Sequence, residues 1–550
     1  MEDINKNISI YEAFLSAVKK DPKRNALYYK GKSFTYEKLN DFIIRKANAL
    51  TNELGIKKGD VVLVALPNIP DVIVLTYALN YIGAIANMVH PFVPYNQLKK
   101  IIKETNTKYA FVFEQRVAKE YESFKEIADI CYVSRIEDDL PLLKKIYYHV
   151  FMNFKIRRKL GKDRKKGFAG YKYQHTLKGS LSGLEYNKNS GSEIALYLHS
   201  ASTTDEPKTI CISNNNMNFI ALQGPNIFGK TFEEVRNYAY VCFLPAFHGF
   251  GLCMSMLLPL CYGMYIALIP KFSPKEIVKV MNKLDVRLFC GVPSAYEKIA
   301  SYNYFAISKK VRSIEVAYCG GDALSQSTKQ KWDNIMIAHN SSCRLFEGYG
   351  LTESVAAVLI NRYNHHKDNT IGYPIDGAKV YCIDENGNEI KDESIGEIVI
   401  ESPSNMVGYL DDKVSTDKAI ENGRLHTGDL GFKDKDGFIH FSSRVKRVIK
   451  VSGVGVFPNE IEKLVSTIDG VNACCAIGVK DNVMGNAIKL FVLASNKTDE
   501  FKNKILDVCR KNLIKWAVPK HIEFVDELPY TQYNKVNFRK LEQMENEKRS

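Results

Sequence analysis

The chain has 550 residues, of which 45% are hydrophobic and 25% are charged. This composition excludes a wholly disordered chain, and the length allows more than one domain. The 12 cysteines form no CxxC pair, so we expect neither a zinc site nor a disulfide framework, and we favour a reducing cytoplasm. The N-terminus, MEDINKNISIYEAF, carries early acids and no apolar run, which argues against a secretory signal.

The formal net charge of +14 is concentrated in one place. Residues 144–166, from Lys144 to Lys166, contain ten Lys or Arg residues and one Asp. A basic character this local argues against nucleic-acid binding by the whole chain. Two interpretations stay open: a solvated, mobile loop between core elements, or a patch for peripheral contact with an anionic membrane, helped by neighbouring Tyr and Phe side chains.

The first 120 residues predict alternating helices and strands. Thr35 is placed to cap a helix whose apolar positions recur every three to four residues until Gly55. A buried strand is expected over residues 61–66, a helix over 71–81 and a further strand over 84–89. This order is typical of a largely parallel sheet that is covered by helices.

The middle of the chain repeats this pattern. Strands are expected at residues 241–244, 288–291 and 315–319, and ligands of α/β sheets collect where such strands end. Residues 249–270 carry no charge, but Pro259 and a turn-like Cys-Tyr-Gly interrupt them. We therefore expect a buried helix followed by a buried strand at residues 264–269, and not a membrane span.

From residue 379 onward, apolar and polar residues alternate around turn signals, which favours an antiparallel subdomain. The predicted fold is therefore α/β. It has a large N-terminal domain, residues 1–443, of mixed but mostly parallel sheets with helices and the antiparallel subdomain. A small, mobile α+β domain, residues 444–550, follows it.

Five stretches carry the candidate chemistry: HSASTTDEPKT (199–209), LPAFHGFG (244–251), YCGGDALS (318–325) with EGYGLTES (347–354), HTGDL (426–430) with RVKRVIKVSGVGVFPNEIE (444–462), and LPYTQYNK (528–535). Their order and spacing resemble the adenylate-forming enzymes over residues 10–542, and most of all the AMP-forming fatty-acyl-CoA synthetases. The resemblance implies a two-step reaction. A carboxylate attacks ATP to give acyl-AMP and pyrophosphate, and coenzyme A then displaces AMP, with Mg²⁺ as the metal.

The first stretch matches the family's phosphate loop, with its hydroxyls and lysine at Ser200, Thr203, Thr204 and Lys208. The family's glycines fall on Ser202, Asp205 and Thr209. A carboxylate 4 Å from a phosphate oxygen would be repelled by about 4 kcal/mol at an effective dielectric near 20. Asp205 avoids this repulsion if it points outward, pairs with Lys208 or helps to hold Mg²⁺, and all three remain open.

The resemblance places the adenine among Gly320, Gly321 and Asp322 on one strand end, and Glu347, Gly348 and Tyr349 on the next. Glycine lets a backbone approach a flat purine, although an ordinary strand-to-helix turn also explains the Gly-Gly pair. Thr352 is expected to donate to the phosphates. Glu353 is expected to hold Mg²⁺, which screens the triphosphate.

The later stretches imply the ribose, hinge and catalytic residues. Asp429 would accept hydrogen bonds from both ribose hydroxyls, with Arg444 beside it. Lys535 would grip the carboxylate and the α-phosphate together, although Asn534 stands where the family has glycine. The weaker matches are Lys446 at the hinge, Lys450 and Gly453 on the loop that faces the site during thioester formation, and His248 at the acyl entrance. For His248, a structural role in the apolar core stays open as the alternative to a role at the acyl entrance.

Three functions compete at this point. The leading hypothesis is an acyl-CoA synthetase acting on a small-molecule carboxylic acid, for which we expect a fatty acid. The second is a stand-alone adenylating enzyme that loads a carrier protein. The third is an acyl- or nucleotide-binding protein whose catalysis is impaired because the phosphate loop lacks its glycines.

Overall fold

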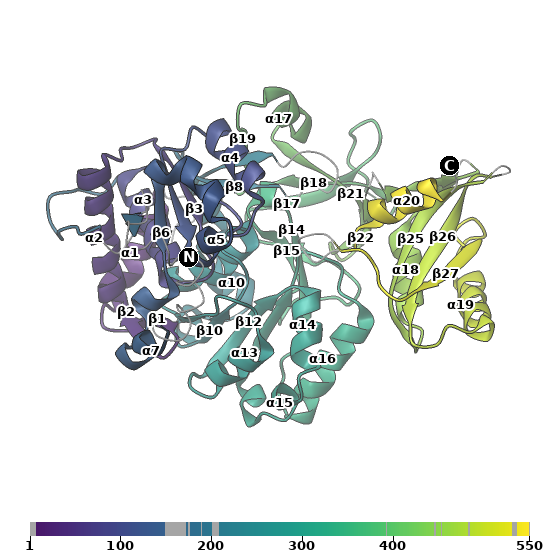
Figure 1. The fold of residues 1–550 in the computed structure, drawn as a ribbon. Coiled ribbons are helices and arrows are strands. Elements are labelled where there is room, and N and C mark those ends of the chain that lie inside the picture. Colours follow the sequence, from purple (N-terminus) through teal and green to yellow (C-terminus); the bar gives the residue numbers. More distant parts are fainter. Residues whose placement is uncertain are drawn as a thin grey trace.

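The computed structural model describes residues 7–148, 172–173, 177–188, 190–200, 208–391, 393–444, 447–452, 454–481, 484–530 and 536–548. A large unit contains strands β1 to β22 and most helices, and a smaller unit at the C-terminal end lies beside it (Figure 1). Strands β21 (Arg424–Lys433) and β22 (Ile439–Arg444) lie where the two units meet (Figure 1).

An eight-stranded sheet contains the predicted N-terminal strands. The strands from β8 to β7 in this sheet run parallel, whereas β9 pairs antiparallel with both β8 and β19. In spatial order its members are β19 (Gly408–Tyr409), β9 (Thr209–Ser213), β8 (Ile194–His199), β4 (Ile85–Met88), β3 (Val61–Ala65), β5 (Tyr109–Phe113), β6 (Cys131–Ser134) and β7 (Lys172–Tyr173).

A nine-stranded sheet forms the second layer of strands. Its central strands, from β14 to β1, are parallel, and the strands at its two ends are antiparallel. In order they are β16 (Tyr373–Pro374), β15 (Ala357–Ile360), β14 (Leu345–Gly350), β13 (Val316–Cys319), β12 (Val286–Gly291), β10 (Ala239–Cys242), β11 (Tyr265–Leu268), β1 (Asn25–Tyr29) and β2 (Lys32–Thr35).

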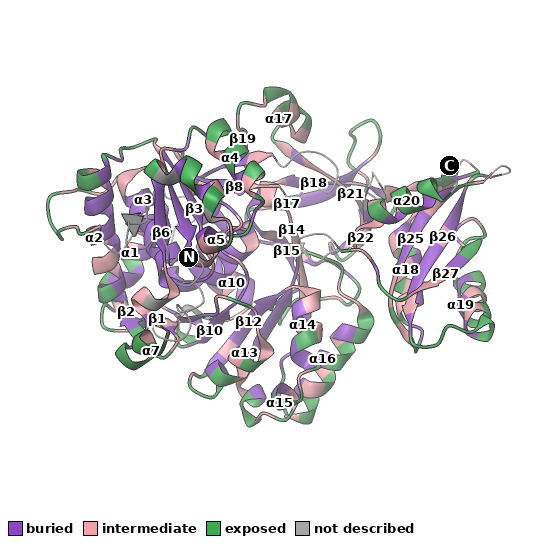
Figure 2. Cartoon of the chain, viewed as in Figure 1, coloured by how far each residue is buried: buried purple, intermediate pink, exposed green. Residues whose placement is uncertain are grey.

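Helices cover the sheets, so most strands of the large unit are buried (Figure 2). In chain order the helices are α1 (Ile10–Lys20), α2 (Tyr36–Leu54), α3 (Pro70–Ile82), α4 (Tyr95–Glu104), α5 (Glu114–Lys119), α6 (Tyr121–Phe124), α7 (Leu142–Tyr147), α9 (Asn214–Ala221), α10 (Gly224–Phe228), α11 (Phe232–Val235), α12 (Leu258–Cys261), α13 (Pro274–Met281), α14 (Pro293–Ala300), α15 (Asn303–Ala306), α16 (Gln326–Ala338) and α17 (Lys413–Ala419).

The uncharged stretch at residues 249–270 folds as expected. A buried π-helical segment (Phe250–Leu257) leads into α12, and the chain then turns into the buried strand β11. Among the described residues, no helix combines the length and the apolar character that a membrane crossing requires. All twelve cysteines lie in the described parts and are free thiols.

The antiparallel subdomain is confirmed as a five-stranded sheet. It contains β17 (Lys379–Ile383), β18 (Gly396–Glu401), β21, β20 (Ile420–Glu421) and β22. The C-terminal unit has its own apolar core and is built from β23 (Ile449–Val451), β24 (Val454–Val456), α18 (Pro458–Ser466), β25 (Val471–Asp481), β26 (Gly485–Ala494), α19 (Asp499–Asn512), β27 (His521–Val525) and α20 (Phe538–Glu547). The α/β class is therefore confirmed, while the boundary at residues 443 and 444 stays a prediction.

The ends of helix α2 test the helix boundaries that the sequence predicted at Thr35 and Gly55. The Thr35 hydroxyl accepts a hydrogen bond from the Lys38 amide at 3.2 Å, and Gly55 closes the helix in the left-handed conformation. We expect Thr35→Ala to lower the free energy of unfolding by about 1 kcal/mol, whereas Thr35→Ser keeps the cap. Denaturant unfolding followed by circular dichroism measures both. Equal midpoints for the two variants would contradict the capping role.

Candidate active site

Two glycine-bearing strand ends approach each other at the expected adenine site. A Cβ added to Gly320, just after β13, would lie 3.0 Å from the carbonyl oxygen of Gly348 on β14. Gly321 adopts a φ of +81°, and a Cβ on Gly350 would collide with the backbone of Ala356. Glycine is therefore required where these backbones pack together.

Tyr349 and Asp429 meet across two sheets. The Tyr349 hydroxyl donates a hydrogen bond of 2.6 Å to the Asp429 carboxylate. Asp429 is 1% exposed, and its backbone pairs with that of Arg444 across β21 and β22. The structure thus brings together the residues expected at the adenine and the ribose. It describes the backbone of Arg444 but not its side chain.

The Thr352-Glu353 segment is held in a strained turn. Thr352 to Ser354 form one 3₁₀ turn, and Val355 follows with φ +68° and ψ −60°. A β-branched residue rarely adopts positive φ, and such strain collects at functional sites. The Met406 amide donates to the Glu353 carbonyl at 2.7 Å. This contact anchors the turn to the segment before β19.

A chain of side chains links Glu353 to the phosphate-loop lysine. The Tyr409 hydroxyl donates to the Glu353 carboxylate at 3.1 Å. The Lys208 ammonium lies 4.8 Å from the centre of the Tyr409 ring and 3.7 Å from the Asp412 carboxylate. It also donates to the Ser415 hydroxyl. The expected phosphate and metal residues therefore contact the same tyrosine, Lys208 at its ring face and Glu353 at its hydroxyl.

The sequence analysis missed Tyr409, Asp412 and Ser415. Asp412 caps α17 through the Ser415 amide at 2.9 Å, which local pattern could have suggested. Their contact with Lys208 spans more than 200 residues. No local signal identifies such a contact.

The LPAFHGFG stretch at residues 244–251, expected at the acyl entrance, lies against the strand end that carries Gly320. The Phe250 ring lies 3.6 Å from the Cβ position of Gly320. His248 begins the following helical segment, and its ring centre lies 4.5 Å from that of Phe247. Phe247 in turn meets the ring of His90 at 4.6 Å. A cluster of aromatic side chains therefore borders the nucleotide residues.

Several expected residues are not brought into this group. Lys450, on β23, is exposed, and its carbonyl accepts from Asn486 within the C-terminal unit. Asp322 is exposed and accepts from the neighbouring Ala323 amide. The remaining expected residues lie outside the described residues, so their roles stay predictions: Thr203, Thr204, Lys446, Gly453 and Lys535, together with Ser202 and Asp205 of the phosphate loop.

Within the described residues, no three His, Cys, Asp or Glu side chains gather into a metal site. Mg²⁺ is commonly held by one or two carboxylates together with substrate phosphates. A single carboxylate at Glu353, which accepts a hydrogen bond from the Tyr409 hydroxyl, fits that kind of site.

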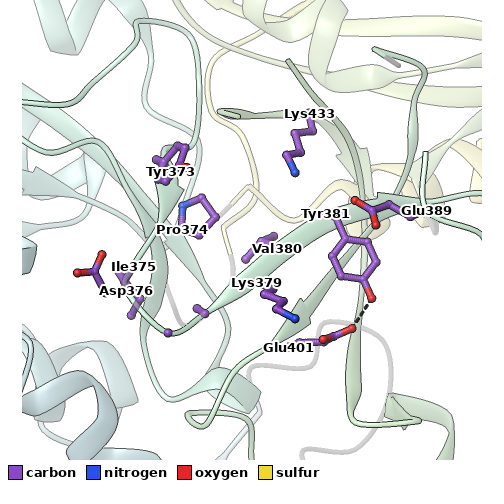
Figure 3. A pocket seen from close by; sticks show the side chains of 12 residues that line it. Tyr373, Pro374, Ile375, Asp376, Lys379, Val380, Tyr381, Glu389, Glu401 and Lys433 are labelled. Atoms are coloured by element: carbon purple, nitrogen blue, oxygen red, sulfur yellow. Dashed lines mark hydrogen bonds between the residues drawn. The ribbon is translucent and has the colours of Figure 1, made fainter. Parts of the chain in front are cut away.

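A surface hollow of about 460 Å³ lies elsewhere, along β17 and β18 (Figure 3). Positively charged lysines and negatively charged glutamates line it, and Tyr381 donates a hydrogen bond to Glu401. It shares no residue with the nucleotide group described above. We therefore do not place the active site there.

Family comparison agrees with this geometry. The AMP-binding enzyme family matches residues 14–410, and the C-terminal domain of AMP-binding enzymes matches residues 460–535. The chain belongs to the AMP-binding enzyme family. In this AMP-binding enzyme, the Tyr349 and Asp429 pair and the close-packed Gly320 and Gly348 lie on or beside the sheets of the large unit.

The curated relatives of this AMP-binding enzyme include CoA ligases. The long-chain-fatty-acid–CoA ligase of Haemophilus influenzae is 29% identical over 100% of this chain and 96% of its own length. The Bacillus subtilis enzyme of the same name is 26% identical over 96% and 92%. The oxalate–CoA ligase of Arabidopsis thaliana is 25% identical over 95% and 96%.

Solved structures share the fold. ATP-bound MatB from Rhodopseudomonas palustris superposes with a TM-score of 0.81 at 21% identity, covering 97% of this chain and 98% of its own. The anthranilate CoA ligase AuaEII, bound to anthranoyl-AMP, gives 0.81 at 19% identity over 98% and 97%. At these identities the likeness describes the fold alone.

The burial of Glu347, which precedes Gly348 on β14, predicts a pH dependence of stability. Burial raises the pKa of its carboxyl from 4.5 to about 7, while Lys463 of α18 and Lys329 of α16 act in the opposite direction. The folded chain thus binds this proton more tightly than the unfolded chain. The contribution of Glu347 to stability therefore falls as pH rises from about 4.5 through 7.

We expect Glu347→Gln to be more stable than the wild type at pH 8, with the difference shrinking towards pH 5. Thermal unfolding across this range measures the difference. Glu185→Gln is the control, because the Glu185 side chain is 89% exposed and pairs with Lys188 only at the surface. A pH-independent difference for Glu347→Gln would contradict the burial argument.

Proposed function

We propose that this enzyme activates a carboxylic acid with ATP through an acyl-AMP intermediate and then transfers the acyl group to coenzyme A. The observation that carries the proposal is the meeting of Tyr349 and Asp429, together with Tyr409, whose hydroxyl contacts Glu353 and whose ring face lies beneath Lys208. Family membership and the CoA-ligase relatives support it.

The proposed chemistry brings one anion to another, so the chain must supply positive charge and hydrogen-bond donors. Asp429 would accept from the ribose hydroxyls, and Tyr349 would lie against the adenine. Thr352 would donate to the phosphates. Bound Mg²⁺ would screen the triphosphate, and Glu353 would hold it. Lys535 would approach the carboxylate and the α-phosphate together, which lowers their mutual repulsion.

The C-terminal unit, which we assign to residues 444–550, would rotate between the two half-reactions. Lys446 lies in the proposed hinge between β22 and β23. Rotation would exchange Lys535 for the segment around Lys450 and Gly453, which would face the site when coenzyme A reacts. Helix α18 already contacts β22 and α16 of the large unit, so this interface would be remade.

The proposed acid is a long-chain fatty acid, because two of the relatives above carry that name. The oxalate-named relative makes the acid class a question for experiment. Acid-dependent exchange of pyrophosphate into ATP, across short, medium, long-chain and aromatic acids, decides it. Adding coenzyme A or a phosphopantetheinyl carrier then separates CoA ligation from carrier loading. If none of these acids supports exchange, the alternative of a catalytically impaired binding protein is favoured.

Lys535 is the first residue to test. We expect Lys535→Ala to lower acyl-AMP formation at least a hundredfold while ATP binding survives, since the lysine acts on the reacting anions. Exchange kinetics and calorimetry measure the two properties. Lys540→Ala is the matched control, because Lys540 lies on the nearby helix α20. Near-normal exchange by Lys535→Ala would rule out the catalytic role.

We also propose that the large unit touches anionic membranes through helix α7. Its side chains Leu142, Leu143, Ile146 and Tyr147 are 73%, 82%, 53% and 61% exposed. They form one helical stripe, exposed at the edge of the large unit (Figure 2). Large adjoining apolar side chains on a surface mark interaction sites, and the basic sequence from Lys144 to Lys166 complements anionic lipid.

Vesicle sedimentation tests this surface. We expect binding to vesicles rich in phosphatidylglycerol and not to pure phosphatidylcholine, with at least a fivefold loss in the double variant Leu142→Ser/Leu143→Ser. The matched control is Tyr304→Ser/Ile307→Ser, since these apolar side chains are 66% and 71% exposed elsewhere. Equal losses in the two double variants would contradict a specific role for α7.

A further inference from the structure

The two ends of the phosphate loop are joined by side chains as well as by backbone. Strands β8 and β9 flank the loop, and His199 pairs with Thr209 across them. The Ser200 amide donates to the Lys208 carbonyl at 3.0 Å, and the Lys208 amide donates to the Ser200 hydroxyl at 2.9 Å. Between these ends lie the residues outside the described part of the chain.

His199 reaches into a buried polar network on the neighbouring strand. Asn87 lies on β4, opposite Tyr197 of β8, so His199 projects from the same face two residues further on. The His199 Nε2 lies 2.7 Å from Asn87 Oδ1. The other ring nitrogen, Nδ1, lies 3.4 Å from the Thr209 hydroxyl, which is the longest contact in the group.

The network fixes which histidine nitrogen carries the proton. The Thr105 hydroxyl donates to the Ile101 carbonyl at 2.7 Å, since a carbonyl can only accept. Thr105 therefore accepts from the Asn87 amide nitrogen at 3.1 Å, and Thr107 lies 2.8 Å from the same hydroxyl. With its nitrogen so engaged, Asn87 presents its carbonyl oxygen to His199.

His199 Nε2 must therefore donate, which leaves Nδ1 as an acceptor for the Thr209 hydroxyl. Burial supports the same assignment, because it lowers the pKa of His199 to about 4 and keeps the ring neutral. The hydrogen bonds thus run in one direction: Thr209 to His199, His199 to Asn87, Asn87 to Thr105, and Thr105 to the end of α4.

We propose that His199 is a positioning residue for ATP, which acts through the Thr209 hydroxyl to fix the base of the phosphate loop. Thr209 stands where the resemblance expects a glycine. A glycine there would have no hydroxyl, whereas Thr209 supplies one that holds the base of the loop through His199. The adjoining residue is Lys208, whose ammonium lies over Tyr409. The clamp therefore sets where the loop delivers its lysine.

This inference rests on the proposed use of ATP, so it is tested by ATP binding without turnover. Thr209→Val removes the hydroxyl at nearly constant volume. We expect it to weaken Mg-ATP binding about five- to tenfold in calorimetry, the effect of one lost hydrogen bond. The KM for the acid should stay within twofold. Thr209→Ser should restore binding, because it restores the hydroxyl.

A double-mutant cycle isolates the coupling between the two residues. His199→Phe should weaken ATP binding by a similar factor, and His199→Phe/Thr209→Val should be no weaker than His199→Phe alone. Cys211→Ala is the matched control, because Cys211 is buried on the same strand and takes no part in this network. Thermal unfolding midpoints verify that each variant is folded.

Binding of Thr209→Val within twofold of the wild type, or fully additive effects in the cycle, overturns the clamp. Failure of pyrophosphate exchange with every acid overturns the proposed function but leaves the clamp standing if the wild type binds ATP and the cycle is non-additive. Absence of ATP binding by the wild-type chain overturns both.

Discussion

The hydrogen bond between Tyr349 and Asp429 is the contact on which the site depends. Tyr349 ends a strand of the nine-stranded sheet, and Asp429 lies on the antiparallel sheet. A carboxylate that is 1% exposed needs such a donor. The bond therefore stabilises the junction of two sheets and also sets a ring beside a carboxylate. The same contact that joins the sheets brings together the two side chains that we propose for the adenine and the ribose.

The second dependence is electrostatic and runs through Tyr409. Its hydroxyl donates to Glu353, while its ring lies beneath the Lys208 ammonium. The ring face and the Asp412 carboxylate, 3.7 Å away, stabilise the Lys208 ammonium, whereas Glu353 contacts the tyrosine at its hydroxyl. Glu353 thus remains separated from Lys208. In the proposed reaction this separation keeps the metal-binding carboxylate from neutralising the phosphate-binding lysine.

The sequence predicted the local elements well. Thr35 and Gly55 mark the two ends of a helix because capping and left-handed conformations are properties of single residues. Motif order predicted that Tyr349 and Asp429 belong together. The contacts of Tyr409 with Lys208 and of His199 with Asn87 depend instead on sheet order, which brings β19 and β4 beside the strands that flank the loop. Periodicity along the chain carries no information about such neighbours.

The unusual composition of the phosphate loop takes on a different meaning in this setting. A glycine at position 209 would contribute no side chain to the ends of the loop. The contacts at those ends are a paired strand end, the Ser200 and Lys208 hydrogen bonds, and a half-buried histidine whose ring nitrogens contact Thr209 and Asn87. The half-buried hydroxyl of Thr209 is therefore a single group on which the contacts at the ends of the loop depend, and a glycine at this position would offer no counterpart.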